Sequence, residues 1–241
     1  MDKSFIIALA IVIVICAVIL YTKTSAFETG GLDSYVINLP RRSDRLQQFK
    51  QHYYKSEIAS NNLIVVQAVD GSNLAEIYGY VTESTQKILT TGKRNSHSEL
   101  TPGMIGCYLS HYKTYEEFLK SGKPTAFIFE DDSKILPIFG STLDNLPPDW
   151  DLVMIGVQSC MECPAVDGKF NRLHDFYGAG GYLINRQGAQ KMIQNKETPI
   201  AHQVDLLIGK LCKEGKLNVY SVKNNLVDTA PMGSDVQMGL S

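Results

Sequence analysis

Short apolar runs alternate with longer amphipathic segments from residue 35 onward, and this alternation constrains the fold more than any other feature. Apolar runs of strand length occur at 35–39, 63–69, 124–129, 151–157, 181–184 and 217–222. Segments with helical spacing of apolar residues lie between them, at 42–55, 104–119, 186–194 and 203–213. Strands connected by helices build a mostly parallel sheet with both faces covered. The sequence therefore predicts one α/β domain, in which residues 72–101 form a mobile loop or small helices.

The first 24 residues have a different character from the rest of the chain. Residues 5–20 include no charged side chain, and as a helix they would span about 24 Å, against about 30 Å for a hydrocarbon core. This run predicts a transmembrane anchor at 1–24, a linker at 25–34 and a folded domain at 35–241. A cleaved signal peptide, with Thr24, Ser25 and Ala26 at the cleavage site, is the alternative. The flanking charges do not predict on which side of the membrane the domain lies.

Charge and cysteine content exclude some classes of protein. The chain has 23 Lys and Arg against 25 Asp and Glu, and a protein that binds nucleic acid usually has a basic excess. The cysteines number 5, an odd count that is not a disulfide framework. Cys160 and Cys163 form a lone CxxC, which is compatible with a zinc site completed by distant ligands, a local disulfide or two unremarkable thiols.

Three consecutive acids, Glu130, Asp131 and Asp132, directly follow the apolar run at 124–129. In open α/β sheets, ligands collect at the carboxyl ends of strands. Adjacent carboxylates repel one another unless a cation or a group of donors neutralises them, and oxygen ligands suit Mg²⁺ or Mn²⁺. The triplet is therefore a candidate metal site, and a solvated acidic turn is the equally ordinary alternative.

Several segments together resemble the motifs of glycosyltransferase family 25, in the order in which that family has them. They are 35–45 (YVINLPRRSDR), 103–111 (GMIGCYLSH), 126–132 (AFIFEDD), 146–156 (LPPDWDLVMIG), 177–189 (YGAGGYLINRQGA), the pair Val204 and Asp205, and 233–237 (GSDVQ). The resemblance covers residues 35–237. It implies a GT-A-like single domain that transfers a hexose, galactose or glucose, from a nucleotide-sugar donor such as a UDP-hexose to a hydroxyl on a glycan, lipid-linked glycan or protein.

The resemblance also implies roles for residues at the strand ends. Glu130, Asp131 and Asp132 would hold Mn²⁺ or Mg²⁺, and through it the donor diphosphate. Asn38 and Arg42 sit at the end of the first strand, where a nucleotide would lie, although Arg42 and Arg45 could equally line an exposed helix face.

Further donor contacts are expected from Asp70, His111, Gly180 and Gly181. Asp70 could accept hydrogen bonds from the nucleoside, or could be an ordinary turn residue before glycine. His111 could donate to phosphate or to the acids, or could be a satisfied core histidine. Gly180 and Gly181 allow the backbone to approach a sugar closely, or simply turn the chain.

Asp205 is the candidate for the base that takes the acceptor proton, and a helix-opening aspartate favoured by the helix dipole is its alternative. His202 as a metal ligand and Asp235 are weaker candidates. Met104 stands where the family pattern has a carboxylate, which makes a catalytically inactive, glycosyltransferase-like binding protein the rival hypothesis. A metal-dependent phosphoesterase is a third, less favoured because the histidines do not cluster with the acids.

Overall fold

The computed structural model describes residues 32–59, 62–92 and 99–229. The predicted anchor at 1–24, most of the predicted linker, and the segment 233–237 with Asp235 lie outside these residues. Across the described ranges, no helix has both the length and the apolar character needed to cross a membrane.

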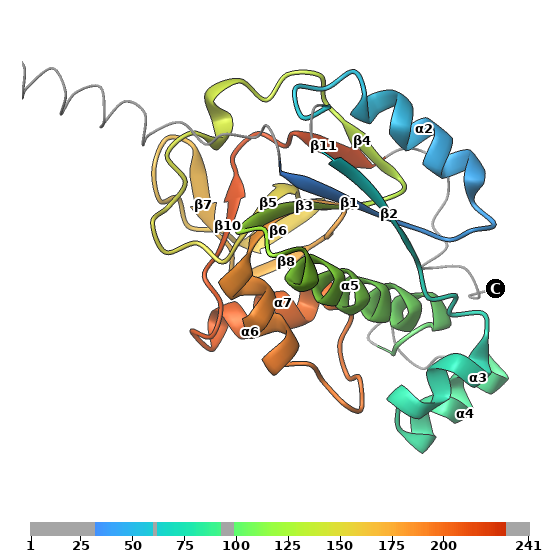
Figure 1. The fold of residues 1–241 in the computed structure, drawn as a ribbon. Coiled ribbons are helices and arrows are strands. Elements are labelled where there is room, and N and C mark those ends of the chain that lie inside the picture. Colours follow the sequence, from blue (N-terminus) through green and yellow to red (C-terminus); the bar gives the residue numbers. More distant parts are fainter. Residues whose placement is uncertain (1–31, 60–61, 93–98, 230–241) are drawn as a thin grey trace, which may run out of the picture.

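A seven-stranded mixed sheet forms the centre of the domain, with the strand order β2-β1-β3-β9-β5-β10-β7 (Figure 1). The strands are β1 (Asp33–Asn38), β2 (Asn62–Gln67), β3 (Thr125–Glu130), β5 (Leu152–Gly156), β7 (Phe170–Arg172), β9 (Gly181–Asn185) and β10 (Val219–Val222). β1 pairs in parallel with β2 and β3, and β10 pairs in parallel with β5, whereas β9 is antiparallel to β3 and β5 and β7 is antiparallel to β10. Five strands thus run in one direction, which confirms the α/β class with a mostly parallel mixed sheet.

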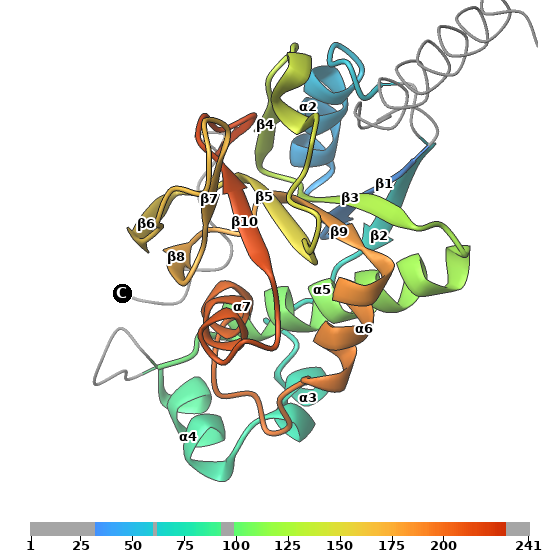
Figure 2. The ribbon, with the colours of Figure 1, turned by 90° about the vertical axis from the view of Figure 1, so that its left-hand side faces the viewer.

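Helices cover both faces of this sheet (Figures 1 and 2). α2 (Ser43–Tyr53) lies on one face, and α5 (Pro102–Ser121), α6 (Arg186–Gln194) and α7 (Val204–Lys213) lie on the other. The alternation of side chains along β3 divides the core accordingly, because Ala126 and Ile128 join the cluster under α5 and α7 while Phe127 and Phe129 join the cluster under α2. Each strand therefore has apolar residues on both faces, as expected of a covered sheet.

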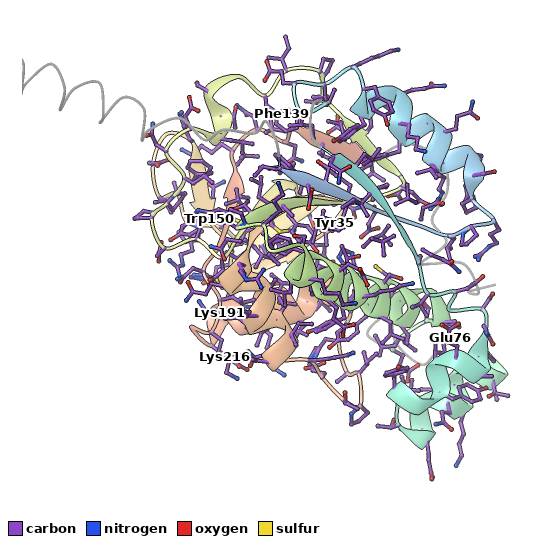
Figure 3. The ribbon with its side chains drawn as sticks, viewed as in Figure 1. Tyr35, Glu76, Phe139, Trp150, Lys191 and Lys216 are labelled. Carbon is purple, nitrogen blue, oxygen red and sulfur yellow. A yellow bond between two sulfur atoms is a disulfide. The ribbon has the colours of Figure 1, made fainter. Side chains whose placement is uncertain are left out.

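Aromatic residues fill both layers of the core. Tyr35 lies between β1 and α5 (Figure 3), with its ring centroid 6.3 Å from that of Phe118. Phe139 packs in the opposite layer, where its ring meets Phe127 edge-on at 6.3 Å.

Local sequence signals explain where α5 begins and ends. The Thr101 hydroxyl accepts a hydrogen bond from the Met104 amide at 3.0 Å, and Pro102 occupies the first turn, where a missing N–H costs nothing. The helix ends at Gly122, whose φ of 75° is readily adopted only by glycine. Met104 is buried in this cap, so the position that departs from the family pattern contributes to packing.

The structure corrects some sequence predictions. β1 begins at Asp33, so the strand replaces the last two residues of the predicted linker. Of the two alternatives for residues 72–101, small helices are confirmed in the described part: α3 (Leu74–Ile77), η1 (Tyr78–Tyr80) and α4 (Glu83–Thr91). Short strands were missed: β4 (Ser133–Ile135) pairs with β11 (Val227–Thr229), and β6 (Ser159–Glu162) pairs with β8 (Asp175–Tyr177). Cys160 and Cys163 form a disulfide, so of the three alternatives for this pair the disulfide is confirmed.

Candidate active site

A cavity of about 470 Å³ opens at the carboxyl ends of β1, β2 and β3. These strands are parallel and in register, with Ile37 opposite Glu130 and Asn38 opposite Gln67, so the segments that follow them converge. The walls include residues from these segments and from the first turns of α5, among them Arg41, Arg45, Asp70, Cys107, Glu130, Asp131 and Asp132. All three predicted metal ligands therefore line one cavity.

Asp131 is held by two donors from the β1–α2 segment. The Asn38 amide donates to Asp131 Oδ2 at 2.6 Å, and Arg45 Nη1 lies 3.2 Å from Oδ1. Burial raises the pKa of Asp131, while Asn38 and Arg45 act in the opposite direction. Because both oxygens have protein partners, Asp131 ties the acidic triplet to β1 and α2.

Asp132 lacks such close neutralisation. Among the residues that the structure describes, the cation that it contacts is Arg45, at 4.0 Å, and that guanidinium is closer to Asp131. Burial and then the charge of Glu130 raise the pKa of Asp132 to about 7. Two guanidiniums, of Arg41 and Arg45, line the cavity with the three carboxyl groups, and that of Arg41 is paired with Asp70. A divalent cation held by carboxylate oxygens of Glu130 and Asp132 would balance the remaining charge. In ligand type, these carboxylates suit Mg²⁺ or Mn²⁺.

Glu130 connects the cavity to a buried chain of polar side chains. Its Oε1 lies 3.3 Å from Nε2 of His111, which is fully buried, and 3.8 Å from Sγ of Cys107. His111 Nδ1 lies 2.7 Å from the hydroxyl of Tyr182, and that hydroxyl lies 2.9 Å from the Tyr115 hydroxyl. His111 therefore contacts the acidic cluster, and within the protein its partners are Tyr182 and Glu130.

Asp70 lines the cavity and forms an ion pair with Arg41. It also accepts hydrogen bonds from the Ser72 amide at 3.0 Å and the Ser72 hydroxyl at 2.7 Å. Partial burial raises the pKa of Asp70, but the Ser72 hydrogen bonds and the Arg41 charge outweigh it and hold the pKa below its usual value. A second cavity of about 300 Å³, lined by Gln67, Glu76 and Lys113 among others, shares this Arg41–Asp70 pair.

Arg42 is not brought into the cavity. Its guanidinium contacts Asp44 at 3.0 and 3.1 Å, and its side chain is only 17% exposed, so it does not line an exposed helix face either. Arg41 and Arg45 line the cavity instead. In the sequence, the place of Arg45 in the first turn of α2, soon after the end of β1, was only a weak indication that it belongs to the site. Its contact with Asp131 depends on how α2 packs against the sheet.

The glycine segment and Asp205 lie beside the acids. The Gly180 carbonyl accepts hydrogen bonds from the Glu130 amide, at 2.9 Å, and from the Ser133 hydroxyl. Gly181 is buried in β9 opposite Phe129. Asp205 Oδ2 accepts from the Gly178 amide at 2.9 Å and Oδ1 from the Leu206 amide at 2.8 Å.

Burial raises the pKa of Asp205, and the charge of Glu130 adds to this effect. Asp205 is not one of the residues that line the 470 Å³ cavity. His202 lies elsewhere and contacts Glu197 at 2.8 Å, so it does not join the acids.

Comparisons with known proteins agree with the motif pattern. Residues 32–150 match the family described as "Glycosyltransferase family 25 (LPS biosynthesis protein)". Procollagen galactosyltransferase 1 of Danio rerio is 32% identical over 179 residues, which are 68% of this chain and 29% of that protein. Procollagen galactosyltransferase 2 of Homo sapiens is 32% identical over 68% of this chain and 28% of that protein.

A probable inactive glycosyltransferase 25 family member 3 of Bos taurus is 29% identical over 69% of this chain and 29% of that protein. Among solved structures, a glycosyltransferase involved in the glycosylation of the major capsid of PBCV-1 superposes with a TM-score of 0.49 and 8% identity, over 85% of this chain and 94% of that one. The chain spans less than a third of the length of the curated relatives it matches. Its motifs, their order and the sequence matches to family members show that the chain belongs to glycosyltransferase family 25.

Proposed function

We propose that this chain is a metal-dependent hexosyltransferase with a GT-A architecture, which moves a sugar from a nucleoside diphosphate donor to an acceptor hydroxyl. The observation that carries this proposal is the convergence of Glu130, Asp131 and Asp132 in one cavity with Arg41 and Arg45. Carboxylates that can hold a divalent cation and guanidiniums that can pair with phosphate oxygens are the two groups that a diphosphate leaving group requires.

Within this site, Glu130 and Asp132 would bind Mn²⁺ or Mg²⁺, and Asp131 would hold the triplet in place through Asn38 and Arg45. The ion, when bound, would neutralise charge on the departing diphosphate. Arg41 is half exposed at the cavity wall, where its guanidinium can reach a phosphate. Asp70 and the smaller cavity beside it provide hydrogen-bond acceptors for the nucleoside.

The transfer step breaks the bond between the anomeric carbon and the diphosphate oxygen, and the diphosphate leaves with the electron pair. The acceptor oxygen forms the new bond and gives its proton to a base. Asp205 remains our candidate for that base: its pKa is raised by burial, which favours proton uptake. Asp205 also accepts hydrogen bonds from the amides of Gly178 and Leu206, and so connects the glycine segment to the first turn of α7.

The names of the relatives support the choice of sugar. Two are procollagen galactosyltransferases, so galactose is the first donor sugar to test and glucose the second, each as the UDP derivative. A hydroxyl on a glycan, a lipid-linked glycan or a protein is the acceptor class. We also propose attachment to a membrane through residues 1–24.

The experiment that tests the proposal is a transfer assay on the purified full chain with a panel of UDP- and other nucleoside diphosphate hexoses, with Mn²⁺, Mg²⁺ or a chelator. We expect turnover of a UDP-hexose that needs the metal. Asp132→Asn should reduce turnover at least about 100-fold, as expected when one electrostatic stabiliser is lost. Glu116→Gln, which changes an exposed acid on α5, is the matched control. Full activity of Asp132→Asn with metal present would reject the assignment.

A catalytically inactive binding protein is the second candidate, and the likeness to probable inactive family members supports it. In this case the cavity would still bind a nucleoside diphosphate and Mn²⁺. Calorimetric titration with UDP and Mn²⁺ separates the two candidates: binding without hydrolysis or transfer of any donor favours the inactive protein.

A further inference from the structure

Cys107 and His111 lie one helical turn apart on α5, and both point toward the end of β3. The spacing of four residues places both side chains on the same face of a helix. Glu130 completes a set of three different ligand types: one sulfur, one nitrogen and one oxygen atom lie within 4.8 Å of one another. This set differs from the oxygen-ligand site proposed above. The two share Glu130, but Asp132 belongs only to the oxygen-ligand site, and Cys107 and His111 belong only to this set.

The two distances from the Glu130 oxygen match those of a coordinated ion. Zinc binds sulfur at about 2.3 Å and imidazole nitrogen or carboxylate oxygen at about 2.0–2.2 Å, usually with tetrahedral geometry. Tetrahedral angles then separate sulfur from oxygen by about 3.6 Å and nitrogen from oxygen by about 3.4 Å. The observed separations are 3.8 Å for Cys107 Sγ and Glu130 Oε1, and 3.3 Å for His111 Nε2 and Glu130 Oε1. The Glu130 oxygen therefore already lies at a coordinating separation from both other atoms, and the sulfur and nitrogen lie within 4.8 Å of each other.

The second nitrogen of His111 already has the kind of partner that orients a metal ligand. Nδ1 lies 2.7 Å from the Tyr182 hydroxyl, and the imidazole is stacked on the Tyr182 ring with centroids 5.8 Å apart. A proton on Nδ1, donated to the Tyr182 oxygen, leaves the Nε2 lone pair directed at Glu130. Such outer partners fix the tautomer and orientation of metal-binding histidines.

We propose that Cys107, His111 and Glu130 form a binding site for a thiophilic divalent cation of the Zn²⁺ class. Two of the three residues, Cys107 and Glu130, line the 470 Å³ cavity, so an ion can enter from it and a water or substrate atom can take the fourth position. Thiolate and imidazole select zinc over Mg²⁺ and Mn²⁺. Because Glu130 belongs to both sites, zinc at this site competes with the oxygen-ligand site for that carboxylate.

The test uses Co²⁺ alone as a spectroscopic probe on the purified full chain. Cobalt bound to a cysteine sulfur gives a thiolate-to-metal charge-transfer band, whereas cobalt bound only to carboxylates does not. We expect this band in the wild type, its loss on addition of Zn²⁺, and its absence in Cys107→Ser. The band would overturn the proposal if it were missing from the wild type or if it persisted in Cys107→Ser.

Other cysteines provide the controls. Cys212 is buried away from the cavity, and Cys212→Ser should keep the band. A double variant, Cys160→Ser with Cys163→Ser, removes the disulfide between β6 and the residue that follows it, and should also keep the band. Loss of the band in the double variant, with a folded protein by circular dichroism, would assign the cobalt to the CxxC instead.

Tyr182→Phe tests the orientation of His111 without removing a ligand. It should weaken zinc affinity by about 10- to 100-fold, the usual effect of losing an outer partner, measured by competition with a chromophoric chelator. A merely structural role for Tyr182 would leave the affinity unchanged. These measurements do not use the transfer reaction, so a negative result here and an inactive enzyme with Mn²⁺ are separate outcomes.

Discussion

The Asn38 amide donates a 2.6 Å hydrogen bond to Oδ2 of Asp131, and this contact joins the carboxyl ends of the parallel strands β1 and β3. Asn38 is also hydrogen-bonded to the Arg42 carbonyl at 3.0 Å. One side chain thus fixes both the acidic triplet and the turn that leads into α2.

Asn38→Ala is expected to destabilise the fold, because it leaves a buried carboxylate oxygen without its donor. A loss of about 1–3 kcal/mol in the free energy of unfolding is the usual cost of such a group. Urea denaturation followed by circular dichroism measures it. Asn73→Ala is the control. Asn73 is exposed and directly precedes α3, so its substitution should change the free energy of unfolding by no more than about 0.5 kcal/mol. Equal effects for the two variants would argue against the role given to Asn38.

Arg45→Met is expected to destabilise the protein more strongly. Arg45 is 4% exposed and lies 3.2 Å from Asp131, closer than any other cation among the described residues, so its removal leaves an uncompensated charge in the interior. Breaking a buried pair on one side costs about 3–5 kcal/mol. The urea midpoint reports the loss, and Lys120→Met, which removes a surface pair with Glu117, should leave the midpoint unchanged. A midpoint like that of the wild type in Arg45→Met would contradict the assignment.

Gly106→Ala is expected to move the loop that forms one wall of the cavity. A Cβ at this position would lie 2.7 Å from the Val69 carbonyl oxygen and 2.8 Å from the Gly71 amide, so the backbone must shift. Overpacking of this kind costs about 1–3 kcal/mol, and under the proposed function it should also weaken UDP binding, measured by calorimetry. Gly79→Ala has no atom within 4 Å of its added carbon and should match the wild type in both measurements.

Glu197 is expected to make stability depend on acid pH. It accepts hydrogen bonds from the amides of Ala201 and His202, each at 3.2 Å, and from Lys210 at 3.1 Å. Burial raises the pKa of Glu197, but the His202 imidazole, whose Nδ1 lies 2.8 Å from Oε1, and the Lys210 ammonium outweigh it, so the pKa lies below the ordinary value of 4.5. The depressed pKa contributes stability that is present above pH 4.5 and is lost as the pH falls through the folded-state pKa.

The measurement for Glu197 is the free energy of unfolding of the wild type and of Glu197→Gln from pH 7 down to pH 3. The difference between them should be largest above pH 4.5 and should shrink below it. Glu116→Gln, at an exposed position, should give a difference that does not change with pH. A constant difference for Glu197→Gln would show that its carboxylate charge does not stabilise the fold.

Local patterns in the sequence determined the central elements. The apolar runs that became β1, β3, β5 and β9 are long enough to be recognised alone, and Gly122 marks the end of α5 because its φ of 75° suits glycine. β4, β6, β7, β8 and β11 have only 3 or 4 residues each. Such strands exist because of their pairing, as when residues 133–135 meet residues 227–229, and no local periodicity predicts a partner so distant along the chain.

The acids themselves were found from their place after an apolar strand, since the carboxyl ends of parallel strands meet at one edge of the sheet. The choice between Arg42 and Arg45 needed the tertiary structure, because it depends on the rotation of α2 against β3: Arg42 contacts Asp44, and Arg45 contacts Asp131. Cys107 became a candidate ligand for the same reason. Its sulfur approaches Glu130 only because α5 packs across the end of β3, and that packing is decided by the core as a whole and not by any segment of the sequence.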